Sequence, residues 1–365
     1  MPTAAGGQAG GQAGGQAGGQ AGGQAGGQAG GQAGGQAGGQ SHSGGGGGPQ
    51  LSWALLATYD AVVGPWDPDE DDARPRRPRP EADDLDYLAR GGRGALLHTR
   101  LLRRVGSAEG PPGAMIDDCR IAALEPPSTG TLARQLAFLR GYADLRADRL
   151  AEILEQQGDI ISFFGGAALL NAGHRRRSLE LLETAQSLVI AVCAEIKHLC
   201  WSPRPVDFDP RVYPVIQTPD HSTYPSGHAT EAFALATVLH RLMTGEGPAA
   251  GASEGAACFR IAHRIAVNRT IAGVHFPVDS AAGAMLGCAL GEALHALATG
   301  EPGMAVSFTP GTGEEADDFG PAEDFTSAWL AGALGSARSV TGLAPEPAWA
   351  LAWRRAAAEW GTEGR

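Results

Sequence analysis

Tyr224-Pro225-Ser226-Gly227-His228 stands immediately before Ala229-Thr230-Glu231-Ala232-Phe233-Ala234-Leu235-Ala236, an apolar run suited to a helix. A serine before such a run is a natural N-cap, and the glycine that follows leaves the first backbone N–H groups of the helix open to an anion. His228 adds a side chain that titrates near neutral pH at the same place. The stretch therefore predicts an oxyanion-binding site, with an ordinary capped helix and an exposed histidine as the alternative.

Charged and titratable side chains occur on both sides of this stretch. Lys197 and Arg204-Pro205 precede it, and Arg269, His275 and Asp279 follow it. Three cations, two histidines and a helix N-terminus suit a tetrahedral or trigonal-bipyramidal trianion. We expect Asp279 to accept a hydrogen bond from one ring nitrogen of His275, which leaves the other nitrogen free to bond vanadium or phosphorus. The alternative for Asp279 is an acid that only favours a helix N-terminus.

This set of residues resembles the superfamily of type 2 phosphatidic acid phosphatases, bacterial acid phosphatases and vanadium-dependent haloperoxidases. Its three motifs are Lys-x6-Arg-Pro, Pro-Ser-Gly-His and Ser-Arg-x5-His-x3-Asp. Each specified position is present here except the serine of the third motif, which Asn268 replaces. The resemblance covers residues from about 185 to 295, with weaker support from about 115, and it is to a compact, soluble bacterial member.

The resemblance implies a role for each matched residue. The groups that would bind the oxygens of vanadate or phosphate are Lys197, Arg204, Ser226, Gly227 and Arg269. His228 would be the acid–base group at the apical oxygen, and His275 the covalent ligand opposite it. In a phosphatase, His275 attacks phosphorus and no cofactor is needed. In a haloperoxidase, His275 binds the vanadium of vanadate, and Lys197 polarises the peroxide.

Both chemistries fit these residues, so the neighbourhood of the motif has to decide between them. His221, a further catalytic residue in this interpretation, stands where algal vanadium bromoperoxidases carry an extra histidine; its alternative is an exposed loop histidine. Ala194 stands where the fungal chloroperoxidase carries a tryptophan. We expect a vanadate-dependent haloperoxidase that oxidises halide, with bromide the expected ion, by hydrogen peroxide to hypohalous acid. The alternatives are a soluble acid-phosphatase-type phosphomonoester hydrolase and, more remotely, an inactive scaffold of the same fold.

The remaining composition limits partners and location. Residues 5–40 repeat Ala-Gly-Gly-Gln and lack the apolar surface that offsets chain entropy, so we expect residues 1–50 to be disordered. The net charge of −12 argues against nucleic acid and leaves small molecules as partners. We expect no signal peptide and no membrane span, and the odd number of cysteines indicates a reducing cytoplasm.

The apolar patterns follow a helical period without convincing two-residue alternation, which predicts an all-α fold, an antiparallel helical bundle. We expect a first helix from residue 51 and a charged Pro/Arg linker within 51–114, the catalytic bundle over 115–300, and an acidic loop with packing helices over 301–365. The expected helices of the bundle span residues 128–158, 160–171, 176–200, 226–244, 256–272 and 278–298. Leucines in the first of these are spaced for one buried face.

Overall fold

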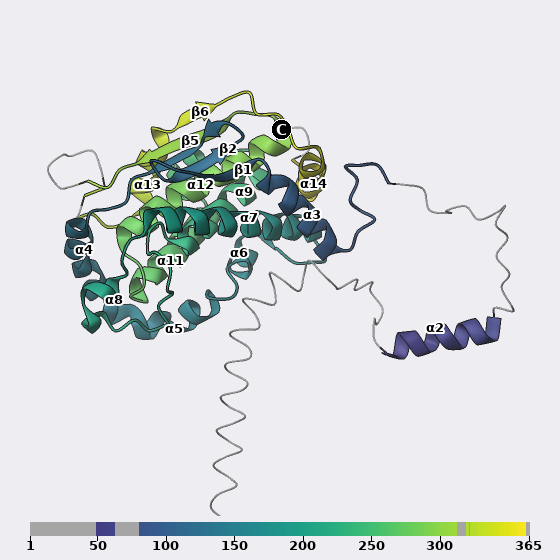
Figure 1. Ribbon diagram of the computed structural model, residues 1–365, viewed down its shortest axis with the longest axis horizontal. Coiled ribbons are helices and arrows are strands. Elements are labelled where there is room, and N and C mark those ends of the chain that lie inside the picture. The colour runs from purple at the N-terminus through teal and green to yellow at the C-terminus, as the bar shows by residue number, and fades with distance from the viewer. Residues whose placement is uncertain (1–48, 63–79, 312–318, 321, 363–365) are drawn as a thin grey trace, which may run out of the picture. The chain divides into compact units, whose positions relative to one another are not determined.

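The computed structural model describes residues 49–62, 80–311, 319–320 and 322–362. The chain divides into two compact units, residues 1–96 and 97–365 (Figure 1). The disorder expected over 1–50 lies outside the described residues, apart from Pro49 and Gln50 at the start of a helix. Most of the expected Pro/Arg linker and the acidic residues 314–318 also lie outside them.

In the first unit, α2 (Pro49–Val62) forms near the helix expected from residue 51. Its described apolar side chains are exposed, Trp53 at 70% and Val62 at 75%. A second helix, α3 (Arg90–Leu102), runs across the boundary in the sequence and buries Leu97 and Leu101.

Helix α12 (Pro277–Thr299) forms the centre of the second unit, and its residues are buried from Pro277 to Ala298. It packs along α9 (Gly227–Thr244). Glycines on α12 allow this close approach, because a Cβ on Gly283 would lie 2.6 Å from the Ser226 carbonyl oxygen and one on Gly287 would overlap the Thr230 carbonyl oxygen. The pairing places the start of α12 beside the start of α9, where the predicted anion site lies.

Two further long helices, α7 (Arg176–Cys200) and α11 (Ala257–Ile271), pack on α9 (Figure 1). Helix α7 has the bounds expected from the sequence, and α9, α11 and α12 begin and end within one residue of expectation. The chain is thus mostly helical around α9 and α12, which agrees with the helical part of the expected fold.

The all-α expectation is wrong in part, because the described residues also form short strands. The antiparallel sheet consists of β1 (Val105–Ala108), β2 (Gly113–Ile116) and β3 (Cys119–Arg120). In the other sheet, β4 (Ala122–Leu124) pairs in parallel with β5 (Gly303–Phe308), which pairs antiparallel with β6 (Arg338–Val340). Apart from β5, these strands carry too few residues for an alternating pattern to stand out, and the residues of β5 do not alternate between apolar and polar.

The helix expected over 128–158 is wrong in its extent. Ser128 does cap it, since its Oγ accepts the Thr131 N–H at 3.0 Å. However, α4 (Thr129–Tyr142) ends in a 3₁₀ turn, η2 (Ala143–Leu145), before α5 (Arg146–Glu155) begins. The turn changes which face of the segment is buried, and as a result the side chains of Leu150 and Leu154 are 40% and 49% exposed. The next helix, α6 (Ile161–Ala168), is shorter than the expected 160–171.

The remaining helices are short. Those between the long helices are α8 (Pro205–Phe208), η3 (Pro210–Val212) and α10 (Pro248–Ser253). Two more follow β5, namely α13 (Ser327–Gly335) and α14 (Pro347–Ala358). Trp349 of α14 is fully buried and donates its indole N–H to the Leu294 carbonyl of α12 at 2.8 Å. This tryptophan anchors α14 on the central helix.

Helix α12 also bears on the expectation that no segment spans a membrane. Within the described residues it is the helix that is long and apolar enough to cross one. It is completely buried by the rest of the unit, and a core helix of a soluble protein has the same composition. The cytoplasmic location therefore stays a prediction.

Candidate active site

The N-terminus of α9 begins the site. Ser226 is the N-cap in extended backbone, and its Oγ accepts the Ala229 N–H at 3.4 Å. The Ser226 N–H donates to the Asp279 carbonyl oxygen at 2.9 Å, which fixes the start of α9 against the start of α12. Gly227 follows without a side chain, so the first turn of the helix is open to an anion.

Lys197 comes from the last turn of α7, which Trp201 ends in the left-handed conformation. Its ammonium donates to the carbonyl oxygens of Ser222 and Thr223 at 2.9 and 3.2 Å. The side chain is buried, and burial lowers the pKa of the ammonium to about 8.

Arg204 stands in extended backbone at the N-cap of α8, as Pro205 requires. Its guanidinium is held by carbonyl oxygens, with Nη1 donating to Val274 at 2.8 Å and Nε to His221 at 3.0 Å. Nη1 also lies 3.2 Å from Nε2 of His275. Arg204 is therefore positioned beside the ring nitrogen that the sequence assigns to bond formation.

His275 lies just before α12, and the first turn of that helix holds its ring. Nδ1 of His275 lies 3.1 Å from Oδ2 of the fully buried Asp279, and the Thr223 hydroxyl donates to the same oxygen at 2.6 Å. Because the Nδ1–H of His275 donates to Asp279, the lone pair of the neutral ring is on Nε2. Burial and the nearby Arg204 hold the pKa of His275 well below its usual range, so the imidazole is neutral at pH 7.

Arg269 extends from the last turn of α11 and is almost completely buried. Nη2 donates to the side-chain oxygen of Gln156 at 2.8 Å and to the Ile153 carbonyl at 3.2 Å. Its Nε and Nη1 have no hydrogen-bond partner in the part of the chain that the structure describes. Buried donors without partners are costly. An anion in the adjacent cavity would satisfy them.

Gln156 connects Arg269 to His228. Nε2 of His228 donates to the Gln156 backbone oxygen at 2.8 Å, so Nδ1 is the atom left for acid–base work. Burial, with a further contribution from Arg269, lowers the pKa of His228 to about 3. The Asn268 side chain donates to the Gln156 side-chain oxygen at 3.1 Å. The residue that departs from the family motif therefore helps to hold Arg269 through Gln156.

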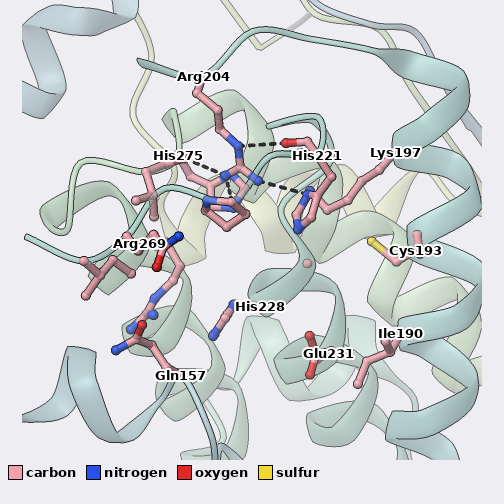
Figure 2. Close-up of a pocket in the computed structure, with 16 residues that line it drawn as sticks. Gln157, Ile190, Cys193, Lys197, Arg204, His221, His228, Glu231, Arg269 and His275 are labelled. Atoms are coloured by element: carbon pink, nitrogen blue, oxygen red, sulfur yellow. Dashed lines mark hydrogen bonds between the residues drawn. The ribbon is translucent and has the colours of Figure 1, made fainter. Parts of the chain in front are cut away.

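A cavity of about 370 Å³ joins these groups (Figure 2). Of the residues expected at the site, those that line it are Lys197, Arg204, His221, Gly227, His228, Arg269 and His275. Ser226 and Asp279 do not line the cavity, since both are fully buried behind it. The structure thus gathers residues from three helices, α7, α9 and α11, and from three loops at one place, as an anion-binding site requires.

His221 lies at the edge of this cavity and is exposed. Its Nδ1 is 3.0 Å from Nη2 of Arg204, and partial burial lowers its pKa. The residue thus contacts the site but is also an exposed loop histidine, as its alternative stated, and its catalytic role stays a prediction.

The sequence did not indicate three further residues of the site. Thr223 holds Asp279, Gln156 holds Arg269, and Glu231 lines the cavity. Only Glu231 could have been found, because it lies one helical turn after Gly227 and so on the same face of α9. Gln156 comes from α5, whose place beside α11 depends on tertiary packing.

Comparison with known proteins agrees with the motifs. Residues 181–300 match the model of the PAP2 superfamily. No curated protein matches the chain. A solved structure, the first transmembrane PAP2-type phosphatidylglycerolphosphate phosphatase from Bacillus subtilis, is similar at 16% identity over 66% of this chain and 90% of that chain. Its TM-score of 0.23 is too low to support an argument about fold or activity.

Proposed function

We propose, on the premise that residues 181–300 belong to the PAP2 superfamily, that this chain is a phosphomonoester hydrolase working through a phosphohistidine at His275. The observation that carries the proposal is the pair of Arg269 guanidinium donors that have no partner among the described residues, in the same cavity as a neutral His275 whose Nε2 lies 3.2 Å from Nη1 of Arg204. This order reverses the sequence-based expectation, which placed the haloperoxidase first. The described residues and water are sufficient for the hydrolase reaction.

In the first step, Lys197, Arg204, Arg269 and the N-terminus of α9 hold the phosphoryl oxygens. Nε2 of His275 forms a bond to phosphorus as the bond to the alcohol oxygen breaks. Asp279 stabilises the positive charge that develops on the ring. His228 gives a proton from Nδ1 to the leaving oxygen. The bound dianion offsets the charge of Arg269 and so raises the pKa of His228, which lets it carry that proton.

In the second step, water attacks phosphorus from the side that the alcohol has left. His228 takes a proton from the water, the phosphorus–nitrogen bond breaks, and phosphate leaves. The negative charge of the substrate therefore binds to the cations and also raises the pKa of His228, so that this histidine can act as the acid.

Purified protein tests this proposal through hydrolysis of an aryl phosphate. His275→Ala should abolish turnover, whereas His228→Ala should lower kcat by about 10²–10⁴-fold and leave sulfate binding largely intact. His198→Ala is the matched control, because this histidine lies on α7 outside the cavity of about 370 Å³. Unchanged hydrolysis in His275→Ala would overturn the proposal.

A vanadate-dependent haloperoxidase is the second candidate, and the contact between His221 and Arg204 favours it. The donors that suit phosphate also suit vanadate, so the residues fit this cofactor; His275 would hold it with Lys197, Arg204 and Arg269. Bound vanadate would supply the activation of peroxide. The test is bromide-dependent peroxidation in the same preparation after addition of vanadate. In that case His221→Phe should lower bromide oxidation more than phosphate ester hydrolysis.

A further inference from the structure

The cavity contains a carboxylate that binding of a simple anion does not explain. Glu231 lines it from the second turn of α9. An ideal Cβ on Gly227 would lie 3.8 Å from Oε1 of Glu231 and 3.6 Å from Cε of Lys197, so the carboxylate adjoins the phosphate-binding turn. A negative charge here opposes binding of a phosphate dianion.

Lys197 and Arg269 act on Glu231 electrostatically, but neither forms an ion pair with it within the described residues. The Gln186 side chain donates to Oε2 at 3.0 Å. Lys197 donates to backbone carbonyls and Arg269 to Gln156 and Ile153, and within the described ranges Glu231 forms no ion pair. Gln186 therefore positions the carboxylate through Oε2, and Oε1 accepts no hydrogen bond from the described residues. Burial raises the pKa of Glu231 to about 7, an effect larger than the opposing ones of Gln186, Lys197 and Arg269.

The direction of phosphoryl transfer decides which part of a substrate would reach Glu231. The attacking and leaving atoms lie on opposite sides of phosphorus. In the view of Figure 2, His228 and Glu231 both lie below His275. The alcohol that leaves toward His228 therefore extends toward Glu231, beside the apolar side chain of Ile190.

We propose that Glu231 selects phosphomonoesters whose alcohol carries an ammonium group, with Gln186 as the residue that positions its carboxylate. The proposal rests on the proposed hydrolase function, because it uses the side of the cavity on which the alcohol would lie. An ammonium group near Oε1 supplies the missing counter-charge and turns an unfavourable carboxylate into a hydrogen-bonded ion pair. The preferred substrates are then short aminoalkyl phosphates.

Phosphonates test this inference without depending on turnover, because the enzyme cannot hydrolyse their phosphorus–carbon bond. Calorimetry would compare 2-aminoethylphosphonate, 2-hydroxyethylphosphonate and ethylphosphonate at pH 7.5. We expect the amino compound to bind the wild-type protein about ten- to hundredfold more tightly than ethylphosphonate. Glu231→Gln should remove this preference and bind ethylphosphonate at least as tightly as before, because a negative charge has gone. Glu254→Gln, at an exposed glutamate outside the cavity, should behave as the wild type.

Several results would overturn the inference. These are equal binding of the amino and ethyl compounds to the wild type, a preference that survives in Glu231→Gln, and a hydroxyl compound that binds as tightly as the amino compound. Hydrolysis of 2-aminoethyl phosphate and ethyl phosphate then separates the two proposals. A binding preference without any hydrolysis would contradict the hydrolase function alone, whereas hydrolysis of both esters at equal kcat/KM would contradict the role of Glu231.

Discussion

Oδ2 of Asp279 lies 3.1 Å from Nδ1 of His275 and also accepts the Phe276 N–H at 2.9 Å. The carboxylate is fully buried, and burial raises its pKa to about 6. Asp279 is thus ionised at pH 7 and accepts the Nδ1 proton of His275, so that the lone pair is on Nε2, beside Nη1 of Arg204.

Asp279→Asn should lower kcat strongly. The amide keeps the shape of the carboxylate but stabilises the charged ring poorly, and a loss of about 10²–10⁴-fold is expected. The wild-type rate should also fall as pH drops below about 6, because protonation of Asp279 removes the same charge. Steady-state kinetics across pH measures both effects. A variant that retains the wild-type kcat would show that Asp279 only stabilises the start of α12.

Gln156→Leu should act on substrate binding more than on proton transfer. Its side-chain oxygen holds Arg269, whereas His228 is bound by the backbone oxygen, which the substitution keeps. Leaving a buried guanidinium donor unpaired costs about 1–3 kcal/mol, so KM should rise by about 5- to 150-fold with a smaller change in kcat. Asn268→Ser should raise KM less than Gln156→Leu does, because the hydrogen bond from Arg269 to Gln156 remains. A fall in kcat alone would contradict this assignment.

Sulfate binding should weaken at alkaline pH. Burial lowers the Lys197 pKa to about 8 in the ligand-free protein, and a bound dianion raises it again by favouring the charged form. Binding above that pH therefore takes up a proton, and the affinity should fall by about tenfold per pH unit. Sulfate keeps its two charges in this range, so titration calorimetry reports on the protein. Lys197→Arg should flatten the fall, and an unchanged slope in this variant would exclude Lys197 as the titrating group.

Gly287→Ala should destabilise the second unit. The added methyl group would overlap the Thr230 carbonyl oxygen of α9, so the two central helices have to separate. A loss of about 1–3 kcal/mol in the free energy of unfolding is expected from urea titration. Gly332→Ala in α13 is the matched control, since nothing lies within 4 Å of its added Cβ and alanine favours a helix. Equal stability of the two variants would show that α9 and α12 do not pack this closely.

The sequence predicted the helices whose ends carry a chemical signal. Helix α9 begins after the Ser226 N-cap and ends at Gly245 in the left-handed conformation, and α12 begins at Pro277. These signals are local, so they can be read without knowledge of the fold.

The features that the sequence did not predict depend on contacts between distant segments. Strand β4 pairs with β5, where Ala122 lies opposite Val306; β4 is too short for a pattern, and the residues of β5 do not alternate between apolar and polar. Gln156 reaches Arg269 only because α5 packs on α11. The leucine spacing of residues 128–158 was misleading because the η2 turn changes the buried face.

The central claim is tested most directly by rapid-quench labelling of the wild-type protein with a radiolabelled phosphomonoester. The labelled protein is then digested under alkaline conditions, and its peptides are identified by mass spectrometry. Phosphohistidine is retained in alkali, so the covalent intermediate can be assigned to one residue. We predict the label on His275, with His275→Ala unlabelled and His228→Ala still labelled. Turnover without label on His275, or label on another residue, would contradict the account.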